Sequence, residues 1–387
     1  MVSAEDVITQ TANCLCKANI FTTNVPKSKL PLKGWACHCE SCRHVTGALC
    51  TLVTSWPEKR ASVDVSGLKA YSFSSRYDLL FCSICSTPIF FANKQETDKE
   101  LGLLTGTLRN TPGDVVKITN HIFVGDTQDG GASMWLRKPN ADGTEAKRYR
   151  ERAETDKGES AEAVLSDWPP HNSLTGSEAK KEGPVPIWCK CKGVSLVWQP
   201  GSYNGIKDDE LPWFVDPATH KALAGFCACE SCRLFGGVDV WNWGFAELKD
   251  IRFANKQPGF PASSDALRAL VDAKDPSIGT LTYFASSSDA QRYFCSNCSA
   301  SVFYASDDRT FMVDVALGVL GASDGARAEG YFSWAYGGAI SHLEENSGYW
   351  RYDLFDRVAK EGERWRIDRN YPKNWRRLAR EKAAEKA

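Results

Sequence analysis

The stretch Cys37-His38-Cys39-Glu40-Ser41-Cys42 places three thiols within six residues, and Cys227-Ala228-Cys229-Glu230-Ser231-Cys232 repeats its spacing further along the chain. Each triplet lies between two shorter cysteine pairs. The complete pattern is Cys14, Cys16, Cys37, Cys39, Cys42, Cys82 and Cys85, then Cys189, Cys191, Cys227, Cys229, Cys232, Cys295 and Cys298. Seven thiols in the same order with the same close spacings indicate a duplicated metal-binding domain.

Fourteen of the fifteen cysteines belong to this pattern. They could form disulfides or bind metal ions. The first residues lack the basic and apolar regions of a signal peptide, so we expect a cytoplasmic or nuclear protein with reduced thiols. Cys-x-Cys and Cys-x-x-Cys pairs in such a protein are typical of zinc sites. We therefore predict zinc, and we expect Cys50, which stands outside the pattern, to be a buried free thiol.

The seven cysteines of each copy divide into four and three. Four thiolates from the outer pairs close a tetrahedral zinc site, whereas three leave a position open for water or substrate. The predicted structural sites are Cys14, Cys16, Cys82 and Cys85, and Cys189, Cys191, Cys295 and Cys298. The predicted catalytic sites are Cys37, Cys39 and Cys42, and Cys227, Cys229 and Cys232. This division predicts about four zinc ions per chain, two in each domain.

A remote fourth ligand would instead close a triplet and make it structural. His121 and His342 are the candidates for that role. His38 is less favoured, because Ala228 occupies its place in the second triplet.

Two further pairs of residues occupy matching places beside the triplets. Glu40 and Glu230 either move protons or shape the loop through hydrogen bonds. Arg43 and Arg233 either bind a carboxylate of a thiol substrate or brace the loop carbonyls. The sequence leaves both alternatives open.

The rest of the chain predicts a mainly β protein with short helices. Alternating apolar residues predict strands at 194–198, 117–124 and 300–304, and a short helix is expected at 264–271. We expect a first zinc domain at 1–138, a polar linker at 139–185 with a short helix near 145–156, a second zinc domain at 186–358 and a charged helical tail at 359–387. The two domains are expected to pack as an internal pseudo-dimer.

Charge and hydropathy narrow the choice of partners. The formal net charge of the 387 residues is -1, so no overall field attracts nucleic acid. No run approaches the roughly 18 apolar residues of a membrane-spanning helix. The expected partner is a small-molecule substrate.

The spacing resembles the glutathione-dependent formaldehyde-activating (Gfa) family, also called the centromere-protein-V/Gfa family. The matching motifs are Cys14-Leu15-Cys16, Cys37 to Arg43 with Gly47, and Phe81-Cys82-Ser83-Ile84-Cys85, and they recur as Cys189-Lys190-Cys191, Cys227 to Arg233 with Gly237, and Phe294-Cys295-Ser296-Asn297-Cys298. The resemblance implies a β-rich, Mss4-like fold in each copy. It also implies a structural zinc at the four-cysteine site and a catalytic zinc at the three-cysteine site. The implied activity is that of a carbon–sulfur lyase that joins glutathione to formaldehyde as S-hydroxymethylglutathione.

The sequence departs from the family pattern in several places. Lys17, Lys192, Ser86 and Ser299 stand where the family has glycine, so those turns are expected to differ. Arg292 keeps the family's lead-in to the last cysteine pair, while the first copy has Leu79 in that place. The His-Ile-Phe segment at 121–123 has no clear second counterpart, and residues 330–334 are the nearest candidate.

Two functions follow from these observations. The first is a zinc-dependent carbon–sulfur lyase that acts on a thiol, with glutathione as co-substrate, and an aldehyde. The alternative is a non-catalytic zinc scaffold that binds a protein or a nucleic acid. Trp241 and Trp243 of the second copy either shape a pocket for a bulkier substrate or belong to the core.

Overall fold

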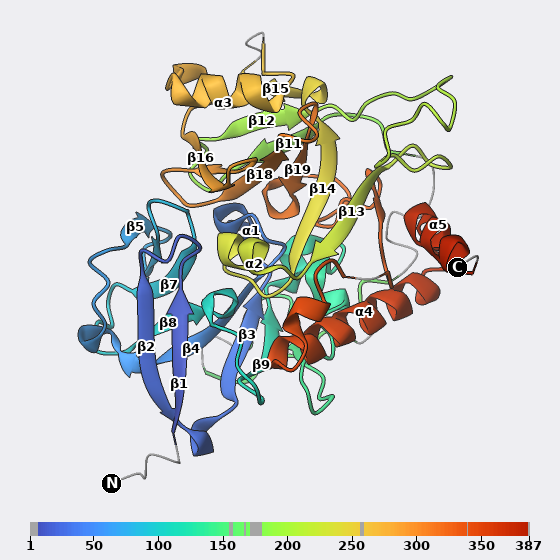
Figure 1. The fold of residues 1–387 in the computed structure, drawn as a ribbon. Coiled ribbons are helices and arrows are strands. Elements are labelled where there is room, and N and C mark those ends of the chain that lie inside the picture. The colour runs from blue at the N-terminus through green and yellow to red at the C-terminus, as the bar shows by residue number, and fades with distance from the viewer. Residues whose placement is uncertain are drawn as a thin grey trace.

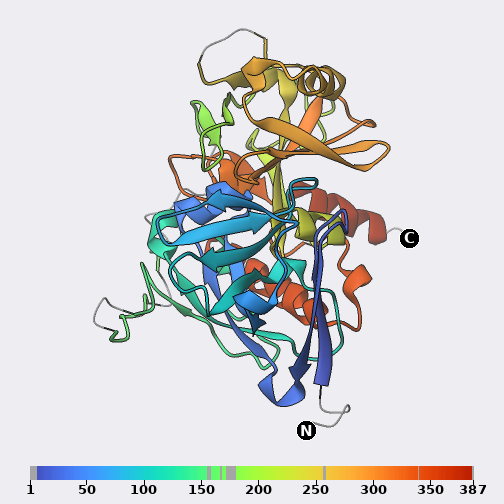
Figure 2. The same ribbon diagram turned by 90° about the vertical axis from the view of Figure 1, so that its left-hand side faces the viewer.

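Two large β-sheets, one in each half of the chain, form the body of the molecule in the computed structural model (Figure 1). The structure describes residues 7–154, 158–165, 168–170, 180–255, 259–338 and 340–385. The second half, lime to orange, lies above the first half, blue to teal, in both views (Figures 1 and 2). The prediction of a mainly β protein is confirmed.

Apart from short 3-10 helices, the described part of the first half contains ten strands and one α-helix. They are β1 (Val7–Asn13), β2 (Ile20–Pro26), β3 (Leu32–Cys37), α1 (Glu40–Thr46), β4 (Thr51–Lys59), β5 (Lys69–Ser72), β6 (Tyr77–Phe81), β7 (Pro88–Asn93), β8 (Glu100–Leu104), β9 (Val116–Ile122) and β10 (Lys147–Arg148).

The second half follows much the same order of elements, with an extra strand and a helix inserted in its middle and two helices added at its end. Its elements are β11 (Val185–Trp188), β12 (Ser195–Trp198), β13 (Ala222–Cys227), α2 (Glu230–Gly236), β14 (Trp241–Glu247), β15 (Ile251–Phe253), α3 (Ser264–Asp272), β16 (Leu281–Ser287), β17 (Ala290–Cys295), β18 (Ser301–Ser306), β19 (Met312–Ala316), β20 (Phe332–Trp334), α4 (Trp350–Asp368) and α5 (Trp375–Ala384).

The two large sheets share one strand order. The first sheet runs β10-β9-β3-β4-β8-β7-β6-β5, and the second, read in the same direction, runs β20-β13-β14-β19-β18-β17-β16. The parallel pair β3–β9 corresponds to the parallel pair β13–β20. In both halves the cysteine triplet begins at the end of β3 or β13 and leads into the short helix that follows, α1 or α2. These two helices lie between the two sheets (Figure 1).

The predicted strands at 194–198, 117–124 and 300–304 are β12, β9 and β18. The predicted helix at 264–271 is α3, and Ser263 caps it by accepting from Ala266 N. The helix expected near 145–156 is wrong for the residues described there, because β10 adds to the sheet beside β9. The buried Arg148 anchors this strand by donating to Leu165 O at 3.0 Å and Trp168 O at 2.9 Å. Residues 155–157 and 171–179 lie outside the described part of the expected linker.

The helical tail begins earlier than predicted and consists of two helices. The first of them, α4, begins beside the first half, where Trp350 N donates to Thr111 O at 3.3 Å, and runs toward α5, which lies near the chain end (Figure 1). Arg137 of the first half donates to Glu361 of α4 at 3.1 Å. Trp365 of α4 is almost fully buried, as expected for an aromatic side chain that packs on a domain. Across the described ranges, no helix is both long and apolar enough to cross a membrane.

The halves meet through reciprocal contacts at α1 and α2. The residue that caps α1, Gly47, accepts a hydrogen bond from Gly318 N at 2.8 Å. The corresponding cap of α2, Gly237, accepts one from Gly106 N at 3.2 Å. Both caps have positive φ, 83° and 67°, which favours glycine. The same pair of contacts is therefore made twice, with the roles of the halves exchanged.

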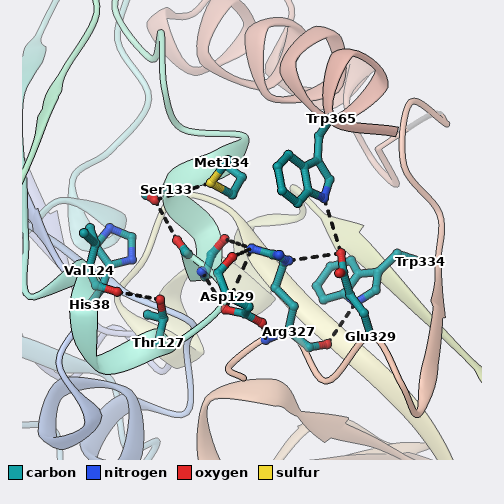
Figure 3. A network of polar contacts seen from close by, with 12 residues as sticks. His38, Val124, Thr127, Asp129, Ser133, Met134, Arg327, Glu329, Trp334 and Trp365 are labelled. Atoms are coloured by element: carbon teal, nitrogen blue, oxygen red, sulfur yellow. Dashed lines mark hydrogen bonds and ion pairs between the residues drawn. The ribbon is translucent and has the colours of Figure 1, made fainter. Parts of the chain in front are cut away.

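A buried ionic cluster also joins the two halves (Figure 3). The fully buried Arg327 donates through its main-chain N to Asp129 of the first half at 2.7 Å, and through Nε to Glu329 at 3.1 Å. Trp365 Nε1 donates to the same Glu329 at 3.3 Å. Because breaking a buried charge pair costs about 3–5 kcal/mol, this cluster fixes the position of α4 against both halves.

Candidate metal centres and a cavity in the second half

The outer cysteine pairs converge on two four-thiol groups. Cys14, Cys16, Cys82 and Cys85 form the first, and Cys189, Cys191, Cys295 and Cys298 form the second. In each group the first pair follows an N-terminal strand of its half, and the second pair lies at the β6–β7 or β17–β18 turn. All sulfur atoms of a group lie within 4.8 Å of one another.

The distances between these sulfur atoms fit a tetrahedral zinc site. The Sγ–Sγ distances are 3.5 Å for Cys14–Cys16 and 3.6 Å for Cys16–Cys82, and 3.5 Å for Cys189–Cys191. A Zn–S bond of about 2.3 Å requires about 3.8 Å between ligand sulfurs, whereas a disulfide requires about 2.05 Å. All fifteen cysteines are free in the structure. Four free thiols at this spacing are a donor set for zinc.

Main-chain N–H groups support the thiolates of these sites. Val194 N donates to Cys189 Sγ at 3.2 Å, and Asn19 N donates to Cys14 Sγ at 3.3 Å. Hydrogen bonds to a sulfur favour its charged form, which is the form that binds metal. The two sites therefore share their surroundings as well as their ligands.

The four residues that replace the family's glycines adopt the left-handed backbone conformation that favours glycine. Lys17 and Lys192 have φ of 61° and 62°, and Ser86 and Ser299 have 60° and 70°. The expectation that these turns differ is therefore wrong. The hydrogen bonds and packing around the thiols hold the left-handed conformation at the cost of some backbone strain.

The triplets each wrap the start of a short helix. Cys37, Cys39 and Cys42 bring their sulfur atoms within 4.8 Å of one another, and Cys227, Cys229 and Cys232 do the same. Cys39 caps α1 by accepting from Cys42 N at 3.3 Å, and Cys229 caps α2 by accepting from Cys232 N at 3.4 Å. A thiolate at a helix N-terminus is stabilised by the helix dipole.

The triplets contain no histidine at this spacing among the described residues. His38 Nε2 lies 3.0 Å from His121 Nδ1, and His121 Nε2 lies 2.9 Å from Leu136 O. The two histidines thus hydrogen-bond to each other, and burial lowers the pKa of both. His342 lies near the second triplet but pairs with Glu345 at 2.6 Å. The geometry brings neither candidate into a triplet as a fourth ligand.

The second half replaces both members of the histidine pair. Cys227 forms a parallel bridge with Ser341, in the place where Cys37 pairs with Ile122. The true counterpart of residues 121–123 is therefore 340–342, and not the expected 330–334. Ile340 then corresponds to His121, and Ala228 to His38. An insertion after β20 hid this relation in the sequence.

The two arginines beside the triplets brace carbonyl groups. Arg43 Nε donates to His38 O at 3.3 Å, and Arg233 donates through Nη1 to Gly106 O and to Leu108 O, the latter at 2.9 Å. Both side chains are buried. This is the second of the two roles considered for them.

The acidic neighbours of the triplets are exposed. Glu230 pairs with Arg233 at 3.3 Å within α2.

The second triplet opens into a cavity of about 470 Å³. Its lining includes the three cysteines together with Trp213, Trp243, Phe245, Arg292, Tyr304, Asp314, Arg376 and Arg380. Trp243 Nε1 and Arg292 Nη1 donate to Cys232 Sγ at 3.4 Å and 3.5 Å. Trp243 therefore shapes the pocket. Trp241, in contrast, is fully buried and belongs to the core.

The corresponding cavity of the first half has a different lining. Its volume is about 690 Å³, and Lys33, Trp35 and Ser55 line it with residues of β9, residues 152–154 and Gly158, but the cysteines do not. Trp35 takes the place of Gly225, since each lies two residues before the first cysteine of its triplet. A Cβ at Gly225 would meet nothing within 4 Å. This glycine leaves space in the second half where the first half has an indole.

Sequence reasoning missed most of the cavity lining. The register places Asp314 opposite Phe245, whereas Gly102 lies opposite Ser55 in the first half. Burial raises the pKa of the Asp314 carboxyl to about 6, although Arg309 at 2.8 Å opposes the shift. The sequence contains the difference between Asp314 and Gly102. That these two residues occupy matching positions, however, is known only once the strand register is known.

The fold and the four thiol groups define a mainly β protein built around cysteine metal sites. Residues 9–126 match the family model of the glutathione-dependent formaldehyde-activating enzyme. The match covers the first cysteine pattern and agrees with the family resemblance that this pattern carries. No curated protein matches the chain.

Proposed function

We propose that the protein is a zinc-dependent carbon–sulfur lyase, similar to S-hydroxymethylglutathione synthase, whose working centre is the Cys227, Cys229 and Cys232 triplet. The observation that carries this proposal is that this triplet lines a cavity large enough for a substrate. The two halves are then diverged copies of one zinc domain that pack as an internal pseudo-dimer. The shared strand order and the reciprocal glycine contacts support this arrangement.

The residues of the cavity suit the reaction. A zinc ion at the triplet would supply a Lewis acid that holds a thiolate or polarises a carbonyl. Arg292 and Trp243 donate to Cys232 Sγ and so keep that sulfur in its thiolate form. When a thiol adds to an aldehyde, a carbon–sulfur bond forms and the thiol proton passes to the carbonyl oxygen. Asp314 and Tyr304 are the cavity residues that we assign to carry this proton.

The first triplet is proposed to serve the structure. It lies beside a buried histidine pair and does not line the cavity of its half. Zinc there would tie β3 to the start of α1, which carries the Gly47 contact to the second half.

The test compares Cys229→Ser with Cys39→Ser, because the two residues hold the same place in the repeated motif. Formation of S-hydroxymethylglutathione from glutathione and formaldehyde is followed by nuclear magnetic resonance, and zinc is counted in each purified variant. We expect each variant to lose one zinc ion per chain, but only Cys229→Ser to lose activity. Activity that survives in Cys229→Ser and disappears in Cys39→Ser would contradict the assignment. A wild type that is inactive with glutathione and a panel of aldehydes would contradict the lyase itself.

A further inference from the structure

The arginines of the last helix, α5, fall into two groups. Arg377 pairs with Glu363 at 2.7 Å and with Glu381 at 2.9 Å. Arg376 and Arg380 line the second cavity instead. Within the described residues, neither of these two has a carboxylate at ion-pair distance. The two arginines of α5 that have no carboxylate partner among the described residues thus line the cavity that holds the triplet, whereas the exposed Lys382 of the same helix lies outside the lining.

This arrangement has an energetic consequence. Arg376 and Arg380 stand at positions i and i+4 of a helix, where two like charges destabilise it by about 0.2–0.5 kcal/mol. An anion between them would turn this repulsion into two charge-assisted hydrogen bonds. The other charges of the cavity are already matched, since Asp314 lies 2.8 Å from Arg309 and Arg292 faces the Cys232 sulfur.

An aromatic wall connects the arginines with the triplet. Trp213 is 40% exposed, and its ring centre lies 5.0 Å from that of Phe245, which also lines the cavity. The Arg376 guanidinium lies over the Trp213 ring at 5.1 Å, a cation–π contact that orients it. Trp213 belongs to the longer segment that separates Cys191 from Cys227 in the second half. Trp213, Arg376 and Arg380 therefore line the cavity of the second half, and the described lining of the corresponding cavity of the first half contains no equivalent residues.

The position of α5 is fixed by contacts on its other side. Asn374 caps the helix by accepting from Arg376 N at 3.0 Å. Just before it, Tyr371 donates to Glu329 at 2.9 Å, which ties this segment to the ionic cluster of Figure 3. The two arginines are thus presented by a helix that is attached to the second sheet.

We propose that the second cavity binds a carboxylate-bearing substrate and that Arg376 and Arg380 hold its carboxylate. The apolar part of that substrate lies along Trp213 and Phe245, and its reacting sulfur or carbonyl lies at the triplet. The identity of the reacting group rests on the proposed function, whereas the recognition of the carboxylate does not.

The test measures binding without turnover. The probes are S-methylglutathione, compared with its dimethyl ester, and (benzylthio)acetate, compared with its methyl ester; both esters lack the carboxylate charges. Binding to the zinc-loaded full chain is followed by calorimetry and by the fluorescence of the cavity tryptophans. The variant Arg376→Gln/Arg380→Gln is compared with Lys382→Gln, which removes one charge from an exposed residue of α5 that does not line the cavity.

We expect the double variant to bind at least one of the two carboxylates about tenfold more weakly or worse. The esters should bind weakly to all forms of the protein, and Lys382→Gln should behave as wild type. Equal binding of acid and ester, equal binding by wild type and the double variant, or no binding of either carboxylate would overturn the proposal.

The outcome separates this inference from the proposed lyase. Binding that depends on the arginines in a protein without lyase activity would leave the inference standing and the proposed function refuted. Lyase activity that is unchanged in the double variant, together with equal binding of acid and ester, would support the proposed function and refute the recognition of a carboxylate by the two arginines.

Discussion

The reciprocal glycine contacts predict that alanine at either Gly106 or Gly318 destabilises the protein to a similar extent. Neither glycine has a positive φ, so the effect of a methyl group is one of space alone. A Cβ at Gly106 would lie 2.7 Å from Gly237 O and closer still to Val238 N. A Cβ at Gly318 would lie 2.6 Å from the carbonyl carbon of Gly47. These neighbours are backbone atoms, which cannot swing away as a side chain would.

The magnitude follows from two contributions. Overpacking of this kind costs about 1–3 kcal/mol, and the loss of the hydrogen bond between the halves adds about 1 kcal/mol. Each variant should therefore lose about 2–4 kcal/mol. For a large domain about 2–4 °C in Tm corresponds to 1 kcal/mol, so Tm should fall by about 4–16 °C.

The assay is differential scanning calorimetry of samples with equal zinc content. Gly225→Ala is the matched control, because a methyl group there meets nothing within 4 Å, and its Tm should stay close to that of wild type. If Gly106→Ala and Gly318→Ala were as stable as Gly225→Ala, the close approach of the halves would be refuted. A large loss in only one of the two would refute the equivalence of the contacts.

Three further predictions concern the metal sites and the cavity. The purified chain should carry about four zinc ions by mass spectrometry. Chelation should lower its Tm sharply, because a structural zinc contributes on the order of 10 kcal/mol in small zinc peptides. Fewer than two ions would contradict zinc binding by at least one of the four-thiol sites. Gly225→Leu should fill the cavity and reduce lyase activity at least about tenfold at an unchanged Tm, while Trp35→Leu in the corresponding place should leave activity intact. The buried His38–His121 pair is neutral in the folded state, and burial lowers the pKa of His121 to about 4. The unfolded chain therefore binds more protons as pH falls from about 6.5 to about 4, and stability should fall over that window by on the order of 2–3 kcal/mol. Denaturant titrations at several pH values should show a flatter profile for His38→Ala/His121→Ile, which carries the residues of the second half; an equal slope would contradict this account.

The cysteine groups and the mainly β fold could be predicted because their determinants are local. A Cys-x-Cys or Cys-x-x-Cys pair fixes two ligands by spacing alone, and alternating apolar residues indicate a strand. The same local reasoning failed at 145–156, where a polar and charged stretch indicated a helix. There the side chain of Arg148 finds main-chain carbonyls across the fold and holds an edge strand instead. Such tertiary contacts override helix propensity and leave no periodic trace in the sequence.

The cavity was hidden for a related reason. Its lining combines strand residues such as Arg292 and Asp314 with Trp213 of an insertion and the arginines of α5. These segments are separated by tens of residues, and only the register of the sheet shows which of them face the same space. The role of Arg43 and Arg233 illustrates the same limit. Their fork geometry suits a substrate carboxylate, yet burial beside unsatisfied carbonyls gives them a structural partner first.

The symmetric and asymmetric features of the molecule lie in different places. The contacts through Gly47, Gly106, Gly237 and Gly318 are made in both directions, and the four-thiol sites share their geometry. The surroundings of the triplets differ, because a neutral histidine pair stands in one half where Ala228 and the cavity stand in the other. A buried histidine pair requires hydrogen-bond partners and so holds the loop around it in place. A cavity that binds a substrate requires empty space and hydrogen-bond donors that are free to contact the substrate. One triplet environment cannot meet both requirements, so a chain with two copies can give the supporting role to the first and the substrate to the second.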